Sequence, residues 1–294
     1  MNPRPILRFL AATLCAAAVA RADAPKKSPT SKLYVADQVG DTQIDTGTEI
    51  DDLTKKSVYN AEGTAIETKA NSNTSVVLSN GTGIYFDVNT RVQVRTFRQD
   101  AFKPDRSDIE DEPSLSNTHL YVNHGVIGVS TSKHVAGSTT VYETPLATAT
   151  IRGRQAVILS QDGLTVISMV QGEATVQAGP LDRPHQVGNH QQIIIRPGKP
   201  GEPNIVEIRD IPDGGFENEI SWLEERVLTA DAARKLVYFE VQVRKGSSDV
   251  TLFDPTTSSG SDSDSGVKEI VPVPVVPANP TVQPNVSPAN LTRG

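Results

Sequence analysis

Short runs rich in Val, Ile and Thr recur about every ten residues between Leu33 and Arg209, with Gly, Asn or Asp between them. This spacing is typical of a chain of many short β-strands, and no helical period of comparable length interrupts it. Apolar and polar residues alternate most clearly over residues 83–88, as a half-buried strand requires. The expected strands cover residues 75–78, 83–88, 91–97, 119–122, 126–130, 139–143, 147–151, 156–160, 164–170, 173–178 and 191–195.

Residues 156–159 and 193–195 are apolar on consecutive positions, which predicts strands buried on both faces. A two-layer or coiled β architecture gives central strands that environment. The pattern therefore predicts a mainly β fold with many short strands, arranged as a two-layer sandwich or a short β-solenoid or roll. This domain is expected to span residues 33–209.

Three segments of the expected domain allow local predictions. Asn80-Gly81 between two strands predicts a type I′ hairpin turn. In the strand at 91–97, Arg91 and Arg95 share the polar side, which is either a solvated sheet face or a patch for an anionic ligand. Residues 100–116 are charged and almost without apolar side chains, so they are expected to form a surface insertion loop. This loop is either mobile with no binding role or a recognition loop.

Beyond Arg209 the period changes to that of a helix. Phe216, Ile220, Leu223 and Val227 share one face, which predicts an amphipathic helix within a helical appendix at 210–245. The helix is expected to dock on the β domain, with a partner-binding helix as the alternative. Asp231 is a candidate cap for a second segment, and residues 237–243 fit both helix and strand. Residues 246–294, rich in Ser and Asp and then in Pro, are expected to be a disordered tether.

The N-terminus has the pattern of a secretory signal peptide over residues 1–22. Two arginines precede a twelve-residue apolar stretch, and Ala20-Arg21-Ala22 forms an A-x-A cleavage site. Twelve helical residues rise about 18 Å, short of the roughly 30 Å hydrocarbon core, which disfavours a retained anchor. We therefore expect an exported protein, periplasmic or extracellular after cleavage near Ala22, with a flexible lead-in at 23–32 and no stable membrane anchor.

Export changes the composition of the mature chain. The signal contains Cys15, the only cysteine, so neither a disulfide nor a catalytic or metal-bound thiolate is expected. The residues before Cys15 do not fit a lipid-modification signal. Loss of three arginines lowers the net charge of the 294-residue chain from −7 to −10. This acidity argues against a nucleic-acid partner, while 37% hydrophobic residues suffice for a packed core.

The sequence contains no recognisable catalytic or metal-binding motif. The five histidines have no fixed ligand spacing, and neither a G-x-S-x-G elbow nor a phosphate-binding loop occurs. We expect a protein that is not an enzyme and that carries no metal or cofactor. A hydrolase that uses dispersed carboxylates on an envelope polysaccharide is the alternative, because sequence cannot pair two such acids.

The order of the segments resembles the FecR-type domain. The family has a Thr-Pro, small residues, a Val/Ile-Arg-Gly-Thr, a strand pair with a Gly-Glu hairpin, and a late Gly before the final strand. Eight residues match this pattern: Thr144, Pro145, Ile151, Arg152, Gly153, Gly172, Glu173 and Gly188. Arg154 stands where the family has Thr. The resemblance covers about residues 33–208.

The resemblance implies candidate binding residues in its signature block, namely Thr144, Pro145, Arg152, Gly153 and Arg154. From the residues themselves, Pro145 marks a strand start or edge and Gly153 permits a bend or bulge. The two arginines have two interpretations. Either one arginine donates hydrogen bonds to backbone carbonyls at the bend while the other is solvated, or the pair forms a site for an anion or a partner.

The resemblance also implies a Gram-negative bacterial origin and a role like that of the periplasmic sensing domain of FecR proteins. In that family a cytoplasmic arm grips a sigma factor and a transmembrane helix follows. Here a cleavable signal leads almost directly into the β domain, which disfavours a transmembrane regulator. We therefore expect an exported, non-catalytic binding or scaffold module of the cell envelope, whose partner is an envelope protein or a glycan.

Overall fold

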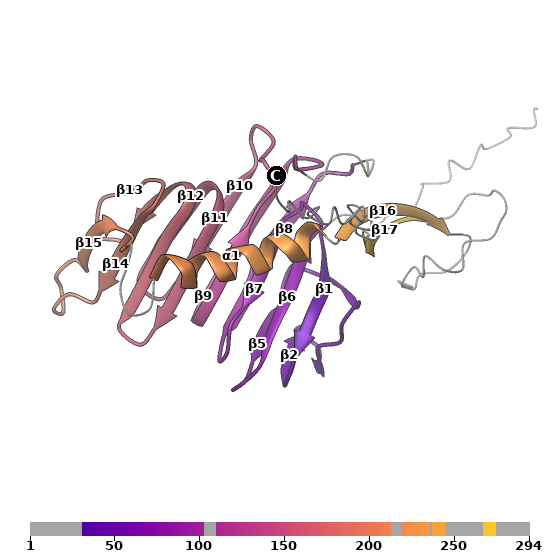
Figure 1. Ribbon diagram of the computed structural model, residues 1–294, viewed down its shortest axis with the longest axis horizontal. Coiled ribbons are helices and arrows are strands. Elements are labelled where there is room, and N and C mark those ends of the chain that lie inside the picture. The colour runs from indigo at the N-terminus through magenta and orange to yellow at the C-terminus, as the bar shows by residue number, and fades with distance from the viewer. Residues whose placement is uncertain (1–30, 103–109, 213–218, 236, 245–266, 275–294) are drawn as a thin grey trace, which may run out of the picture.

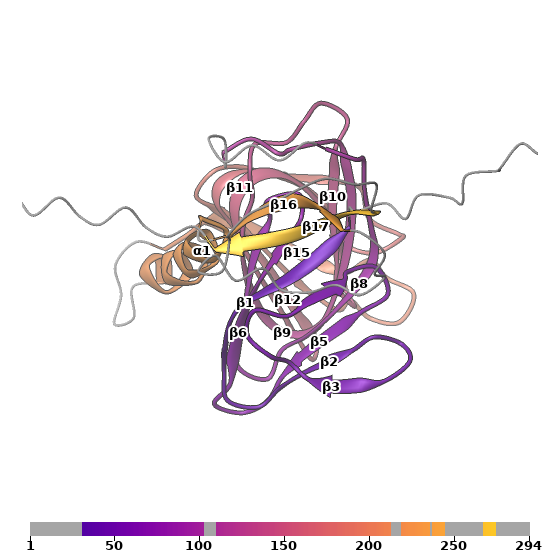
Figure 2. The ribbon, with the colours of Figure 1, turned by 90° about the vertical axis from the view of Figure 1, so that its right-hand side faces the viewer.

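The computed structural model describes residues 31–102, 110–212, 219–235, 237–244 and 267–274. Strands β1 to β15 form one continuous sheet, which folds over so that its two halves face each other (Figures 1 and 2). The mainly β fold expected from the sequence is thereby confirmed, and the sheet takes the two-layer form, which was one of the two expected arrangements. The signal peptide at 1–22 and all but the last two residues of the lead-in lie outside the described residues.

One half of the sheet, the helix-side layer, is covered on its outer face by the single helix of the described residues. Its strands, in hydrogen-bonded order, are β4 (Val58–Asn60), β1 (Lys32–Val39), β6 (Asn73–Leu78), β7 (Gly83–Phe86), the second half of β9 (Ser116–Ser130), the second half of β11 (Thr148–Gln161), the first half of β12 (Leu164–Gln177), β14 (Gln191–Arg196) and β15 (Ile205–Asp210).

The other half, the opposite layer, has no helix on its outer face. Its strands, in hydrogen-bonded order, are β3 (Ile50–Asp52), β2 (Thr42–Asp45), β5 (Ala65–Thr68), β8 (Arg91–Gln99), the first half of β9, β10 (Thr139–Glu143), the first half of β11, the second half of β12 and β13 (His185–Val187). β10 runs parallel to β9, and the other strand neighbours are antiparallel.

Three long strands connect the layers, and here the expected strand boundaries were wrong. Pairs of strands expected at 119–122 and 126–130, at 147–151 and 156–160, and at 164–170 and 173–178 are β9, β11 and β12, each continuous. β9 bends at Gly125, whose φ is 99°. β11 and β12 bend where Gly153 faces Gly172, at the bulge that the sequence predicts for Gly153. A Cβ on Gly172 would collide with Gly153, so two glycines let the ladder bend without breaking.

The turn between β6 and β7 differs from the expected type I′ hairpin. Gly81 has a φ of 86°, whereas Asn80 is not in the left-handed region. Gly81 N donates to Leu78 O at 2.9 Å, and Leu78 N donates to Thr82 O at 2.8 Å. These bonds define a tight turn followed by a glycine bulge. Asn80 is instead buried, and its amide donates to Ser116 Oγ at 3.0 Å, which fixes the turn to β9.

The main core fills the space between the two layers. Its largest fully buried side chains include Phe86, Phe97, Leu120, Ile158 and Ile167. The inward positions come from the alternation within each strand, because successive side chains point to opposite faces. In β8, for example, Val92 and Val94 are buried while Gln93 and Arg95 are exposed, as the sequence predicts.

The helix α1 (Glu219–Lys235) lies across the strands on the outer face of the helix-side layer (Figures 1 and 2). Leu223 and Val227 pack on Val157 and its neighbours, so residues 156–159 are covered on both sides. The expected docking of the helix on the β domain is confirmed, while Phe216 lies outside the described residues. No helix within the described ranges has the length and apolar character that a bilayer crossing needs.

The region after α1 corrects two expectations. Residues 237–244 form strand β16 (Val237–Arg244) rather than more of a helical appendix, and it pairs antiparallel with β17 (Val267–Pro274). β17 belongs to the stretch for which the composition indicates a disordered tail. Pro272 and Pro274 are compatible with a two-stranded ladder, because each strand keeps one free edge where a missing N–H is tolerated. The rest of 246–294 lies outside the described residues.

The expected surface loop at 100–116 is more closely packed than its composition indicates, and residues 103–109 lie outside the described residues. Glu112 is 4% exposed, and its carboxylate accepts a bond from Val135 N at 2.9 Å and another from Ser116 Oγ. Lys133 N also donates to Glu110 O at 2.7 Å. Glu112 therefore anchors this end of the segment to the loop between β9 and β10.

Two glycines set how closely α1 approaches the sheet. A Cβ on Gly83 would collide with the backbone carbonyl of Ala230, and one on Gly128 would lie 2.6 Å from the carbonyl group of Arg226. Neither glycine is among those with a positive φ, so close approach rather than backbone conformation requires them. The helix can rest on the sheet only because these two positions lack side chains.

We predict that Gly128→Ala lowers the free energy of unfolding by about 2 kcal/mol, because α1 must move away from the sheet to admit the methyl group. The matched control is Gly188→Ala, whose Cβ would lie 3.3 Å from the flexible end of the Gln191 side chain. The control is expected to change stability by less than about 0.5 kcal/mol. Urea unfolding measures both, and equal effects would contradict the proposed contact.

Candidate functional site

One edge of the two-layer body, here called the turn edge, collects turns from both layers. These are Asp87–Asn89 between β7 and β8, the bend at Asn123–Gly125 in β9, Thr144–Ala147 between β10 and β11, and Gln161–Gly163 between β11 and β12. Ser160 Oγ donates to the carbonyl of Asn123 at 3.1 Å. This bond joins the bend in β9 to the end of β11, and turns held on a rigid sheet are common places for binding residues.

A groove of about 800 Å³ lies at the turn edge. It is lined by Asp87–Asn89, Asn123–Val126, Pro145, Ser160–Asp162 and Trp222. The volume falls within the range of small-molecule sites, roughly 300 to 1,000 Å³. The lining combines amide, imidazole and carboxylate side chains with the apolar surfaces of Val88, Pro145 and Trp222.

An ion pair joins α1 to the β7–β8 turn at one side of this groove. Arg226 Nε donates to Asp87 Oδ2 at 2.8 Å, and both side chains are about 14% exposed or less. The Arg226 guanidinium also lies over the Trp222 ring, 3.6 Å from its centroid, in a cation–π contact. Asp87 is therefore neutralised by Arg226, and the Trp222 ring is held in one orientation.

The five signature residues expected to bind a ligand lie at two different edges of the molecule. Thr144 is buried, and its hydroxyl accepts from Ala147 N at 3.0 Å and contacts the hydroxyl of Thr165 at 3.0 Å. Its side chain thus shapes the turn rather than facing solvent. Pro145 is exposed and lies between the groove and a second hollow of about 400 Å³.

Arg152, Gly153 and Arg154 lie at the other edge, where β11 crosses between the layers. The Gly153 carbonyl accepts from Thr131 Oγ1 at 2.7 Å, and Arg154 pairs with Glu110. Arg152 is exposed and makes no ion pair within the described residues. The structure therefore does not bring these three residues together with Thr144 and Pro145 into one site.

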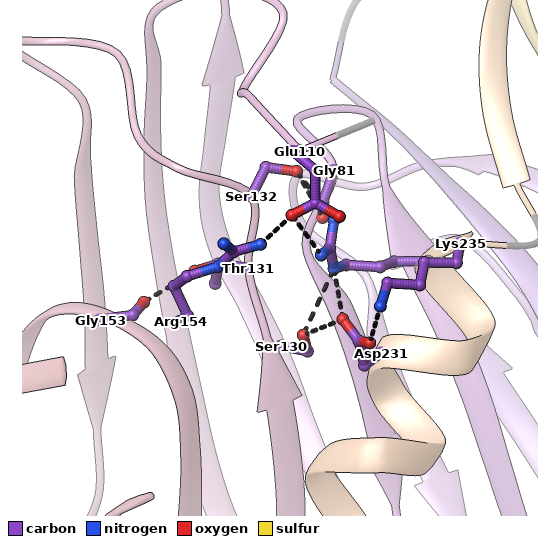
Figure 3. Close-up of polar contacts among 10 residues, drawn as sticks. Gly81, Glu110, Ser130, Thr131, Ser132, Gly153, Arg154, Asp231 and Lys235 are labelled. Atoms are coloured by element: carbon purple, nitrogen blue, oxygen red, sulfur yellow. Dashed lines mark hydrogen bonds and ion pairs between the residues drawn. The ribbon is translucent and has the colours of Figure 1, made fainter. Parts of the chain in front are cut away.

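Arg154 belongs to a polar cluster at the end of α1 (Figure 3). Asp231 accepts from Ser130 Oγ at 2.8 Å and from Arg234 Nε at 2.9 Å. Arg234 is 2% exposed at its side chain and also lies 3.5 Å from Glu110, which joins it to Arg154. The expectation that Asp231 begins a second segment was wrong, because Asp231 lies inside α1 and binds the sheet instead.

The surroundings of two carboxylates in this cluster shift their pKa values. Burial opposes ionisation of Asp231, but hydrogen bonds from Lys235 and Ser130 and the charge of Arg234 outweigh it and hold its pKa below the ordinary 3.8. The hydrogen bond from Arg154 and the charge of Arg234 likewise lower the pKa of Glu110. Both groups therefore stabilise the fold in their ionised form.

The two arginines on the polar side of β8 are paired with carboxylates. Arg91 pairs with Glu67 and lies 3.6 Å from Asp45, and Arg95 pairs with Glu143 and stacks over Tyr121 at 4.1 Å. Because carboxylates already neutralise both arginines, the contacts favour a solvated sheet face over a patch for an anionic ligand.

The histidines make separate local contacts. His119 contacts Glu143 at 2.9 Å, His185 contacts Asp182 at 2.8 Å, and His124 contacts Asn123 at 3.0 Å. Among the residues that the structure describes, no group of three or more His, Cys, Asp or Glu side chains is arranged to hold a metal ion.

Sequence reasoning did not single out the groove or most of its lining. Asn89, Asn123 and Gln161 come from three turns that are distant along the chain. The one available signal was Trp222, the only tryptophan of the chain, which lies on a helix otherwise rich in charged residues.

We predict that Arg234→Met lowers the free energy of unfolding by about 3 kcal/mol, because it removes the buried cation beside Asp231 and leaves only the half-exposed Lys235 paired with that carboxylate. Arg152→Met is the matched control, and it is expected to change stability by less than about 0.5 kcal/mol. Urea unfolding of the three proteins measures this difference. Similar losses in both variants would show that the cluster does not hold α1.

We also predict an acid-sensitive attachment of α1. Because the pKa of Asp231 is lower in the folded state, its contribution is present above the ordinary value of 3.8 and is lost as the pH falls through the folded pKa. The free energy of unfolding should decline between about pH 5 and pH 2, and less steeply in Asp231→Asn. The variant Glu110→Gln measures the contribution of the second carboxylate to the same pH dependence. An unchanged slope in Asp231→Asn would contradict the assignment.

No protein-family model and no curated protein matches the chain. Among solved structures, it is similar to two proteins from Parabacteroides distasonis that are provisionally assigned as anti-sigma factors. The first shares 12% identity and a TM-score of 0.37, over 50% of this chain and 59% of that one. The second shares 15% identity and a TM-score of 0.38, over 56% and 74%. The chain thus covers less than two thirds of the first.

Proposed function

We propose that this protein is an exported, non-catalytic binding module of the bacterial cell envelope, and that it binds through the turn-edge groove. The observation that carries the proposal is the groove of about 800 Å³, whose lining includes exposed polar side chains from three turns. Asn89, Gln161 and Asp162 line it, are exposed, and make no side-chain hydrogen bond within the described residues. Their polar groups are therefore available to a ligand.

The groove is supported by a rigid framework, which favours a preformed site. β9 and β11, which supply two of the lining turns, take part in both layers, and the Asp87–Arg226 pair joins the sheet to α1 beside the groove. A binding site whose residues are already in place spends less binding free energy on ordering them.

The location in the envelope rests on the sequence. The pattern of residues 1–22 is that of a cleavable signal. The remaining chain has no cysteine, so an oxidising compartment would not change its covalent structure. The FecR-type resemblance of residues 33–208 supports a binding role outside the cytoplasm.

We predict that full-length protein captures a component of the native cell envelope, and that Asn123→Ala/Gln161→Ala weakens this capture about tenfold. The expected size follows from losing two side-chain hydrogen bonds of about 0.5 to 1.5 kcal/mol each. Gln93→Ala/Asn117→Ala is the matched control, because it removes the same two side-chain types from the exposed face of the opposite layer. Quantitative pull-down from envelope fractions measures the capture.

The same preparation tests export, since N-terminal sequencing should find the mature chain beginning near Asp23. Retention of residues 1–22 in the inner membrane would contradict the exported module. Capture that both double variants retain equally would contradict the role of the groove.

A further inference from the structure

We propose that the turn-edge groove binds a neutral oligosaccharide. The inference rests on the proposed function above and specifies the ligand class of that site.

The apolar part of the lining suits the C–H face of a sugar ring. Trp222, Pro145 and Val88 line the groove together, and Val88 is 43% exposed. A tryptophan ring supplies a large flat surface at little cost in conformational entropy. The guanidinium of Arg226 lies 3.6 Å from the ring centroid, so it covers one face of the ring and reduces its freedom, and a sugar would contact the part of the ring that lines the groove.

The polar part of the lining suits hydroxyl groups. Asn89 and Gln161 are exposed amides with no hydrogen bond within the described residues, and each amide offers both donors and acceptors. Asn123 and His124 lie beside them, with Asn123 Oδ1 at 3.0 Å from His124 Nδ1. A sugar hydroxyl donates and accepts at the same time, so a set of amides and an imidazole can satisfy several hydroxyls at once.

The charge of the lining favours a neutral ligand. Its two carboxylates are Asp87 and Asp162, and Arg226 neutralises Asp87. Asp162 is exposed and has no ion pair within the described residues. A phosphate, sulfate or uronate group in the groove would therefore face an uncompensated carboxylate, whereas a neutral hydroxyl could donate to it.

The backbone around the groove argues against a protein segment as the ligand. A peptide that adds a strand needs free N–H and C=O groups along an edge. Here Val126 N donates to Thr90 Oγ1 at 3.0 Å, the Val126 carbonyl accepts from Asp87 N at 3.0 Å, and the Asn123 carbonyl accepts from Ser160 Oγ. These three groups are already bonded and cannot pair with an added strand, which favours recognition by side chains.

The experiment uses the single tryptophan as a reporter at the site. The full-length mature protein is titrated with chitotetraose, cellotetraose, maltotetraose and, as an anionic comparison, tetragalacturonate, while Trp222 emission is recorded. We expect at least one neutral tetraose to change the emission saturably with a Kd of about 1 mM or tighter. Tetragalacturonate should bind at least about tenfold more weakly than that tetraose.

Variants separate the groove from the rest of the surface. Asn123→Ala/Gln161→Ala should weaken binding about tenfold, while Gln93→Ala/Asn117→Ala leaves it unchanged. Asp162→Asn should narrow the difference between neutral and anionic tetraoses, because it removes the repelling charge and keeps an acceptor. Circular dichroism and thermal melting establish that each variant is folded, and Gln161→Ala alone replaces the double variant if that one is unstable.

The outcomes distinguish this inference from the proposed function. No saturable change with any neutral tetraose up to about 10 mM, or equal binding by both double variants, overturns the oligosaccharide inference. If an envelope protein is then captured in a groove-dependent way, the binding module stands with a protein ligand. If no envelope component is captured, the oligosaccharide inference and the proposed binding function are both wrong. Cleavage of a bound tetraose would support the ligand class and overturn the non-catalytic role.

Discussion

The structure depends on three strands, β9, β11 and β12, that belong to both layers at once. Each crosses from one layer to the other without losing its hydrogen-bonded neighbours, and the crossings need backbone without side chains. Gly125 bends β9 at one edge, and Gly153 against Gly172 bends β11 and β12 at the other. Because the ladder continues through the bends, neither layer can separate from the other without breaking strand pairs as well as the core between them.

The helix adds directional contacts to an attachment that is otherwise apolar. Burial of Leu223 and Val227 would tolerate small shifts of α1 along the sheet, since apolar contact has little directionality. The Arg226–Asp87 pair and the bond from Ser130 to Asp231 are directional and lie at separate points of the helix. Together they define one position for α1, and that position brings Trp222 to the groove.

Sequence patterns predicted the strands well because alternation reflects which face of each strand is buried, as in β8. They failed where the same residue types serve different purposes. Gly125 bends a continuous strand where a connection was expected, because along the chain a bend and a turn have similar compositions, and the bulge expected at Gly153 likewise leaves β11 unbroken. Asn80 was expected to shape its turn through a positive φ, but it is buried and binds Ser116. The groove was not predictable, because its lining comes together only when distant turns meet at one edge.

The same pairing of α1 with distant strands has a consequence for how the chain reaches this fold. Asp231 binds a residue 101 positions earlier, and Arg226 binds one 139 positions earlier. Ordering contacts across such separations costs loop-closure entropy, and the helix follows in the chain the strands that receive it. Until α1 docks, Val157 and its neighbours form an apolar strip on the outer face of an otherwise complete sheet. We therefore expect α1 to dock after the sheet has formed, and a chain whose helix is undocked would expose that strip to other copies.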